Sequence, residues 1–232
     1  MPQALRQGLV LCCSFDRDEE GRITDGSAKK NDGSARGGTW VREAKVGGGY
    51  RCGATSGHID VGARESLRLT QTDFSIAAWI KLDGYNYIGN GIVGSAPWAS
   101  PGRGYFFRVE GTENGSPGRL SGSFYTADGS SYIRSTGTPI DMGSWHHVAW
   151  TWSAKVGHRL YVDGQPVEDT ETRGGLAEMA DYAPSVWLGV EWRERGSYNR
   201  GLNGVLDEVM IFERALSAAE IKAVHDTQKG AR

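Results

Sequence analysis

The sequence predicts an all-β protein: one antiparallel β-sandwich of the jelly-roll kind, covering about residues 5–226, with a short C-terminal helix. Two observations favour this class. Short stretches of alternating apolar and polar residues recur along the chain, separated by Gly, Asn and Asp-Gly turns, and the 34 glycines and 7 prolines supply turns without indicating disorder. A chain of 232 residues suits one sandwich better than two domains. We therefore expect a single domain and a disordered tail at 227–232.

The first strand is expected within residues 8–16, and it leads into an acidic loop. The carboxylates of this loop are Asp18, Glu19, Glu20, Asp25 and Asp32. Such a density of oxygen ligands suits a hard cation such as calcium. The spacing does not match the EF-hand pattern, and a solvated acidic loop is the alternative.

Further strands follow at short intervals. The most regular is 73–81, where Phe74, Ile76 and Ile80 alternate with Trp79 and its same-parity neighbours. Trp79 is therefore interpreted as a core or inter-sheet residue rather than a platform for a ligand. The other expected strands lie at 40–41, 47–52, 58–61, 92–93, 105–109, 120–125, 131–135, 145–152 and 159–162, with one more beginning at 187.

The stretch from 204 to 221 begins as a strand and ends as a helix. Ser217 is a good N-cap, and Glu220 stands three residues later, as in a capping box. Asp207 places a carboxylate in the middle of an otherwise apolar strand. If Asp207 is buried, it must be hydrogen-bonded, paired or bound to a metal.

Three stretches together carry a family resemblance. They are G-V-L-D-E-V-M-I-F-E-R-A-L-S-A-A-E-I at 204–221, F-S-I-A-A-W-I-K at 74–81, and W-H-H-V-A at 145–149 followed by L-Y-V-D-G at 160–164. The chain resembles the laminin-G-like jelly-roll domains of the concanavalin A-like lectin/glucanase superfamily. The resemblance implies an extracellular or cell-surface location.

The same resemblance implies one structural calcium ion, held by the opening loop and the Asp of the closing strand. The residues at the matching positions, and hence our predicted ligands, are Asp16, Asp25, Asn31 and Asp207. Ala28 stands where glycine is usual in that loop.

The cysteines and the paired histidines are assigned no chemistry. Cys12, Cys13 and Cys52 are expected to be free buried thiols, although Cys52 could pair with either of the others. His146 and His147 point to opposite faces of one strand, so they cannot chelate one ion together. Neither lies near a patterned carboxylate in the sequence, and both are interpreted as structural.

Aromatic and polar loops provide the candidate ligand-binding residues. Sugar rings lie against aromatic faces while their hydroxyls need planar donors and acceptors, and the loops at 83–118 and 192–201 combine both. The candidates are Tyr87, Trp98, Trp192, Arg193, Arg195 and Tyr198. The alternative is that Tyr87 and Trp98 simply fill the sandwich.

Composition and motifs exclude several other functions. The net charge of −2 comes from scattered charges, so nothing favours nucleic acid, and no apolar run is long enough for membrane insertion. The N-terminus has no secretion signal, so either the protein is made without one or the chain is trimmed from a longer precursor. No E-x-D-x-x-E strand, G-x-S-x-G elbow or phosphate loop is present.

The sequence therefore favours a non-catalytic, lectin-like module that binds an oligo- or polysaccharide and carries a structural calcium site. A protein-interaction or adhesion domain is the first alternative, and a flat apolar surface patch would favour it. A hydrolase or lyase with a dispersed site is the second, and a deep cleft with two facing carboxylates would favour that.

Overall fold

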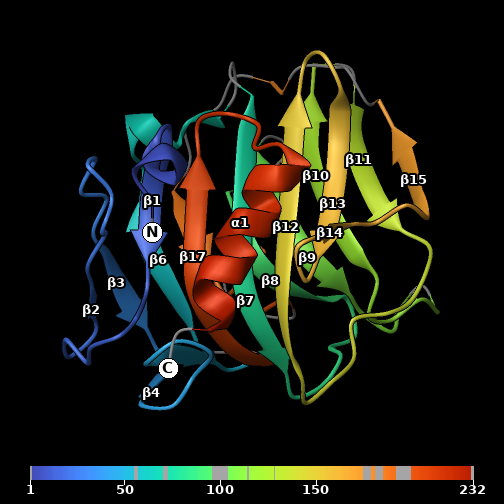
Figure 1. The fold of residues 1–232 in the computed structure, drawn as a ribbon. Coiled ribbons are helices and arrows are strands. Elements are labelled where there is room, and N and C mark those ends of the chain that lie inside the picture. The colour runs from blue at the N-terminus through green and yellow to red at the C-terminus, as the bar shows by residue number, and fades with distance from the viewer. Residues whose placement is uncertain are drawn as a thin grey trace.

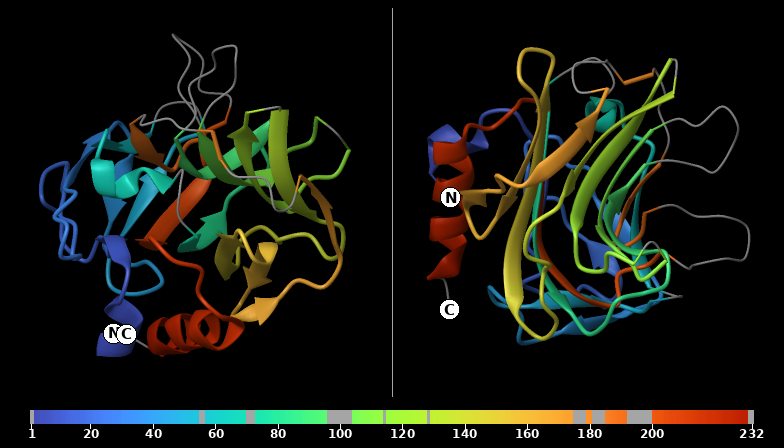
Figure 2. Two further views of the ribbon diagram at one scale, coloured as in Figure 1. Left: turned by 90° about the horizontal axis from the view of Figure 1, so that it is seen from above. Right: turned by 90° about the vertical axis from the view of Figure 1, so that its right-hand side faces the viewer.

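The computed structural model describes residues 2–54, 57–69, 73–95, 104–113, 115–127, 129–174, 179–180, 185–191 and 200–230. Two antiparallel sheets pack face to face, and one helix lies on the outer side of the first sheet (Figures 1 and 2). The predicted β-sandwich with a C-terminal helix is confirmed.

The first sheet has eight strands within the described residues. Its order is β14 (Gln165–Pro166), β13 (Gly157–Val162), β12 (Trp145–Ser153), β7 (Phe74–Leu82), β17 (Gly204–Phe212), β5 (Gly49–Cys52) and β4 (Thr39–Val41), with β1 (Leu9–Cys13) also paired to β17. The pairing of β1 with β17 joins the two ends of the chain in one sheet.

The second sheet has nine strands in the same part of the chain. Its order is β15 (Thr170–Arg173), β11 (Gly129–Ser135), β10 (Leu120–Thr126), β9 (Tyr105–Glu110), β8 (Gly89–Gly94), β16 (Val186–Leu188), β6 (His58–Gly62), β3 (Gly33–Arg36) and β2 (Arg22–Ile23). Two short 3₁₀ helices, η1 (Gln3–Arg6) and η2 (Glu65–Leu67), complete the described elements.

The main core fills the space between the two sheets. The alternate residues of β7, including Phe74 and Ile76, are fully buried there, as the sequence pattern predicts. Phe74 meets the Trp150 ring edge-on at 4.8 Å between centroids. The Trp150 ring also lies against the backbone of β10, where a Cβ on Gly122 would come within 2.4 Å of it. Glycine is therefore required at this position in the strand.

A second, smaller core lies between the first sheet and α1 (Ala218–Lys229). Its members include Ala77 of β7, Ala149 of β12 and Met210 of β17, with Leu5 of η1 at its edge. Trp79 is buried, as predicted, but it lies under α1 rather than between the sheets, with its ring stacked on His225 at 5.4 Å. Both η1 and α1 thus cover the outer face of the first sheet (Figure 2).

The capping box at the start of α1 is confirmed, because the Ser217 side chain accepts from the Glu220 N–H and Glu220 accepts from the Ser217 N–H. The predicted disordered tail at 227–232 is wrong in its first part. The helix continues to Lys229, and the buried Gln228 side chain bonds both Trp79 and Glu208. These two buried hydrogen bonds stabilise the last turn of the helix.

All three cysteines are free thiols, as expected. Cys13 and Cys52 are buried, and burial raises the pKa of Cys52 to about 12.

Among the described residues, no helix is both long enough and apolar enough to cross a membrane.

Candidate ligand-binding groove

The outer face of the second sheet lies on the side away from α1 (Figure 2). This face is polar because buried and outward-facing side chains alternate along three neighbouring strands. In β9, Tyr105, Phe107 and Val109 enter the core, which leaves Phe106, Arg108 and Glu110 on the outer face. In β10 the outward residues are Ser121 and Ser123, and in β11 they are Tyr132 and Arg134.

The strand register arranges these side chains in two rows. Phe106, Ser123 and Tyr132 lie opposite one another across the three strands, and so do Arg108, Ser121 and Arg134. The middle strand therefore provides a floor of small serines between two walls, each made of one aromatic ring and one arginine. We call this pocket of about 280 Å³ the groove; its lining is Phe106, Arg108, Glu110, Ser121, Ser123, Tyr132 and Arg134.

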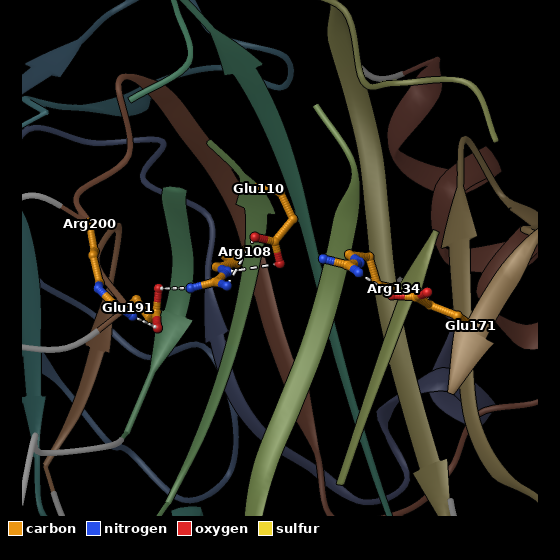
Figure 3. A network of polar contacts seen from close by, with 6 residues as sticks. All are labelled: Arg108, Glu110, Arg134, Glu171, Glu191 and Arg200. Carbon is orange, nitrogen blue, oxygen red and sulfur yellow. Dashed lines mark hydrogen bonds and ion pairs between the residues drawn. The ribbon is translucent and has the colours of Figure 1, made fainter. Parts of the chain in front are cut away.

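A buried ion network holds one wall of the groove (Figure 3). Arg108 donates from Nε and Nη2 to the two carboxylate oxygens of Glu110, at 3.1 and 2.9 Å, and from Nη1 to Glu191 at 2.8 Å. Arg200 donates to the other oxygen of Glu191 at 2.5 Å. Burial alone would lower the pKa of Arg108, but the carboxylates of Glu191 and Glu110 outweigh it and raise that pKa. The guanidinium is thus permanently charged and fixed in direction.

Residues 190–191 and Arg200 lie across the sheet beside the groove, close to two glycines of β8. We call these residues the crossing segment. A Cβ on Gly94 would lie 1.6 Å from the Glu191 carbonyl oxygen, and one on Gly91 would lie 2.1 Å from the Glu191 nitrogen. The Arg200 carbonyl accepts from the N–H groups of both Gly91 and Glu191. Glu191 and Arg200 are therefore anchored on the outer face by backbone bonds as well as by the ion network.

On the opposite wall of the groove, formed by β11, the arginine has fewer hydrogen-bond partners than Arg108 has. Arg134 forms an ion pair with Glu171 on the edge strand β15, whose side chain is 41% exposed. The Nε of Arg134 is buried and has no hydrogen-bond partner among the described residues. Arg173 lies opposite Tyr132 in the β11–β15 register and is exposed.

The two buried carboxylates of the network are poorly suited to catalysis. Glu110 and Glu191 are 4% and 1% exposed, and every one of their four oxygens accepts a hydrogen bond from an arginine. A glycosidase needs one carboxyl that can carry a proton and another that faces the sugar. Both carboxylates are instead held by the arginines of the network, and neither faces the groove as a free carboxyl.

Tyr87 is the one predicted ligand-binding residue that the structure describes. It is 65% exposed in the connection between β7 and β8, beyond the Glu110 end of the groove, and it does not line the groove. Trp98, Trp192, Arg193, Arg195 and Tyr198 lie outside the described residues. The residues that flank them are described: Ser95 and Gly104 border β8 and β9, and Glu191 and Arg200 lie beside the groove.

The predicted metal ligands fall into two separate places. Asp25 and Asn31 form the first, and their polar atoms are largely engaged by the protein. Asp25 accepts from the N–H groups of Cys12, Ser27 and Asn31 and from the Ser27 hydroxyl, at 2.6 to 2.8 Å. The Asn31 amide nitrogen donates to the Val10 carbonyl and to Ser66. These bonds close the first loop and engage both carboxylate oxygens of Asp25.

Asp16 and Asp207 form the second place, and both lie against residues 45–47. Asp207 is fully buried and accepts from the N–H groups of Lys45, Val46 and Glu208. A Cβ on Gly47 would lie 2.2 Å from an Asp16 oxygen, which places that carboxylate against the same loop. The pKa of Asp207 is raised to about 8: burial is the largest cause, the charges of Glu208 and Asp16 act in the same direction, and the N–H donors oppose them.

A cation would relieve this repulsion between Asp16 and Asp207, so these two residues fit part of a calcium site. In the part of the chain that the structure describes, however, no three His, Cys, Asp or Glu side chains converge as a metal-binding group. The calcium ion therefore stays a prediction.

The histidines do lie on opposite faces of β12, but one of them has carboxylate partners that the sequence did not reveal. His146 bridges Asp141 and Asp163, at 2.7 and 2.9 Å, and the bond to Asp163 raises its pKa despite partial burial. His147 is buried under α1, and burial lowers its pKa to about 3.

A buried serine and histidine also come together between the sheets. Trp150 Nε1 donates to His158 Nδ1, so the proton of the neutral ring sits on Nε2, which contacts Ser131 Oγ at 2.7 Å. Because His158 donates to this serine, it cannot act as the base for it. The pair is a structural hydrogen-bond chain.

Sequence reasoning missed the groove, although it predicted the strands that form it. The sequence signal was the alternation of residues in 105–110 and 120–124, in which every second residue points away from the core. This alternation places Phe106, Arg108 and Glu110 on the face opposite the apolar one. The pairing of Arg108 with Glu191, which is distant in sequence, had no local signal.

The comparisons with known proteins agree with this architecture. A family model described as the concanavalin A-like lectin/glucanases superfamily matches residues 53–222, so the chain belongs to this superfamily and the resemblance is confirmed. The human adhesion G-protein coupled receptor D1 is 34% identical over 109 residues, which make up 46% of this chain and 12% of the receptor.

Two solved structures share the fold at low identity. The binding domain of Paraclostridial Mosquitocidal Protein 1 has a TM-score of 0.74 at 20% identity, over 96% of this chain and 53% of that one. Domain 4 of an extracellular arabinanase from Geobacillus stearothermophilus, in complex with arabinotriose, has a TM-score of 0.66 at 17% identity, over 94% and 98% of the two chains. The chain thus spans about half the length of the toxin domain and a small part of the receptor.

Proposed function

We propose that this member of the concanavalin A-like superfamily is a non-catalytic carbohydrate-binding module whose ligand lies in the groove. The observation that carries the proposal is the serine floor between two walls that each pair a ring with an arginine. A sugar can place its apolar C–H face on a ring while its hydroxyls meet guanidinium donors and serine oxygens.

Size and rigidity support the same ligand. At about 280 Å³, the groove lies just below the usual range of small-molecule pockets, which suits one sugar ring of a longer glycan. The Arg108 network fixes one wall before the ligand arrives, so binding orders few side chains. The arabinanase domain of the same fold, in complex with arabinotriose, supports carbohydrate as the ligand class.

The test is a glycan array with and without calcium, followed by calorimetry on any glycan that binds. Tyr132→Ala should weaken binding about tenfold, equivalent to about 1.4 kcal/mol, because one wall loses its ring. Val156→Ala is the control, since Val156 is exposed in the turn between β12 and β13. Unchanged affinity in Tyr132→Ala would move the site away from the groove.

The same titrations decide whether the predicted loops extend the site. Trp192→Ala and Tyr87→Ala should each weaken binding without unfolding the domain if those side chains contact the glycan. If neither variant differs from the wild type while Tyr132→Ala does, the groove is the whole site.

Protein binding is the second candidate function. It is favoured by the 34% identity to a human adhesion receptor, which also supports an extracellular or cell-surface location. If calorimetry across a broad glycan panel shows no heat while a protein partner binds, the adhesion function replaces the lectin-like one.

A further inference from the structure

We propose that the groove selects glycans bearing a carboxylate, as uronic and sialic acids do, and that Arg134 and Arg173 bind this acid group. The inference rests on the proposed function, because it specifies which sugars the groove takes. The supporting observations are the charged side chains on the outer face of the second sheet and the ion pairs among them, in which arginines and glutamates are not matched one to one.

The described charged residues on the outer face near the groove carry an excess of positive charge, although the whole chain has a net charge of −2. Among the described residues, the outward positions of β9, β10, β11 and β15, together with Glu191 and Arg200 of the crossing segment, hold four arginines and three glutamates, an excess of one positive charge. They are Arg108, Arg134, Arg173, Arg200, Glu110, Glu171 and Glu191.

The excess charge is located on the β11–β15 side. Arg108 and Arg200 share Glu110 and Glu191 in the buried network, and those four charges cancel. On the other side two arginines share one glutamate: Arg134 pairs with Glu171, and no ion pair joins Arg173 to a described carboxylate. A carboxylate from the ligand would supply the missing negative charge.

The register brings the two arginines within reach of one acid group. Arg134 lies opposite Glu171 and Tyr132 lies opposite Arg173, so Arg134 and Arg173 are diagonal neighbours on one face. Diagonal Cβ atoms of paired strands are about 7 Å apart, a distance that two guanidinium groups can bridge around one carboxylate. Arg134 uses Nη2 for Glu171, which leaves the hydrogens of Nη1 for the ligand.

Glu110 also lines the groove but should not repel such a ligand strongly. It is 4% exposed, and Arg108 binds both of its oxygens. Its negative charge is therefore already opposed at close range, and the partly exposed Glu171 is the residue that competes with an acidic sugar for Arg134.

The experiment compares matched sugars on the intact chain. Methyl glycosides of glucose and galactose are titrated beside those of glucuronic and galacturonic acid, together with the corresponding pairs on a glycan array. The uronic members should bind more tightly, and added salt of about 0.5 M should remove most of the difference.

Charge variants test the residues. Arg134→Gln and Arg173→Gln should each lower uronate affinity on the order of threefold at low salt, and Glu171→Gln should raise it by a similar factor. Arg159→Gln, an exposed arginine of β13 in the first sheet, is the control and should change nothing.

The outcomes separate this inference from the proposed function. If neutral sugars bind as well as their uronic partners, or salt leaves the ratio unchanged, the acid preference is wrong while the lectin-like function stands. If no sugar of either kind binds in the array or the titration, both fail.

Discussion

At the scale of single residues, Arg108 connects parts of the chain that are far apart. It lies in β9 and binds Glu110 two residues away and Glu191 eighty-three residues away. Its side chain is 15% exposed, and the two glutamates are almost completely buried. Removing one member of a buried ion network leaves its partners charged and desolvated, and this is more harmful than losing an exposed pair.

Arg108→Gln should therefore lower the free energy of unfolding by about 3–5 kcal/mol. Urea denaturation followed by tryptophan fluorescence measures this. Arg22→Gln provides the control, because its ion pair with Asp32 is exposed to solvent and should contribute little to stability. Equal losses in the two variants would mean that the network adds little to stability.

The buried carboxyl of Glu208 should make the stability of the protein depend on pH. Burial raises its pKa to about 7 from an ordinary 4.5, against a hydrogen bond from Gln228 that lowers it. Between these two values Glu208 holds a proton more often in the folded state than in the unfolded state. Its contribution to the free energy of unfolding should therefore fall as pH rises from about 4.5 to about 7. His147, with its pKa lowered to about 3, has the opposite effect from about 3 to 6.5.

Comparing wild type with Glu208→Gln isolates the contribution of this residue. The variant keeps a side-chain oxygen for Gln228 but cannot ionise, so its stability relative to wild type should increase between pH 5 and pH 7. Unfolding midpoints at several pH values measure the difference. A constant difference across this range would show that Glu208 ionises as freely in the folded protein as in the unfolded chain.

At the scale of elements, α1 is joined to the first sheet by a polar contact inside an apolar interface. Gln228 in its last turn accepts from Trp79 Nε1 at 3.0 Å and donates to Glu208 at 2.7 Å. The apolar side chains of this interface, which include Ala77, Ala149, Met210 and Val224, are buried. The amide therefore satisfies two buried groups that have no access to water.

Gln228→Ala should lower stability by about 2–4 kcal/mol, since it leaves both the indole N–H and the carboxyl unsatisfied. Hydrogen exchange of the α1 amides should accelerate in the same variant. Lys222→Ala on the exposed side of α1 is the matched control and should change stability by less than about 0.5 kcal/mol. A similar effect in both variants would place the stabilisation of α1 in its apolar contacts alone.

At the scale of the whole molecule, the sandwich was predictable because its strands are locally encoded. Period-two patterns such as that of 73–81, and the Ser217 to Glu220 cap, depend only on neighbouring residues. The need of Asp207 for buried partners was predictable too, but the loop that supplies them, at Lys45 and Val46, was not. The groove depends on register between strands, which no single strand encodes.

The predicted calcium ion also belongs to the whole molecule, because it would join the first loop to the closing strand. The structure narrows the test. Asp25 and Asn31 already have protein partners, whereas Asp16 and Asp207 both lie against residues 45–47 and the charge of Asp16 raises the pKa of Asp207. Asp16 also lines a pocket of about 270 Å³ together with Ser14 and Glu19. An ion here would need backbone oxygens and water to complete six to eight ligands.

Thermal unfolding with chelator and then with added calcium tests this prediction. A calcium concentration a hundred times Kd should raise stability by about 2.7 kcal/mol, since the ion binds only the folded state. Asp16→Asn should abolish the response, while Asp32→Asn, which alters the nearby exposed Arg22 pair, should keep it. If the midpoint does not change and elemental analysis finds no metal, Asp207 is held by its three backbone N–H donors alone.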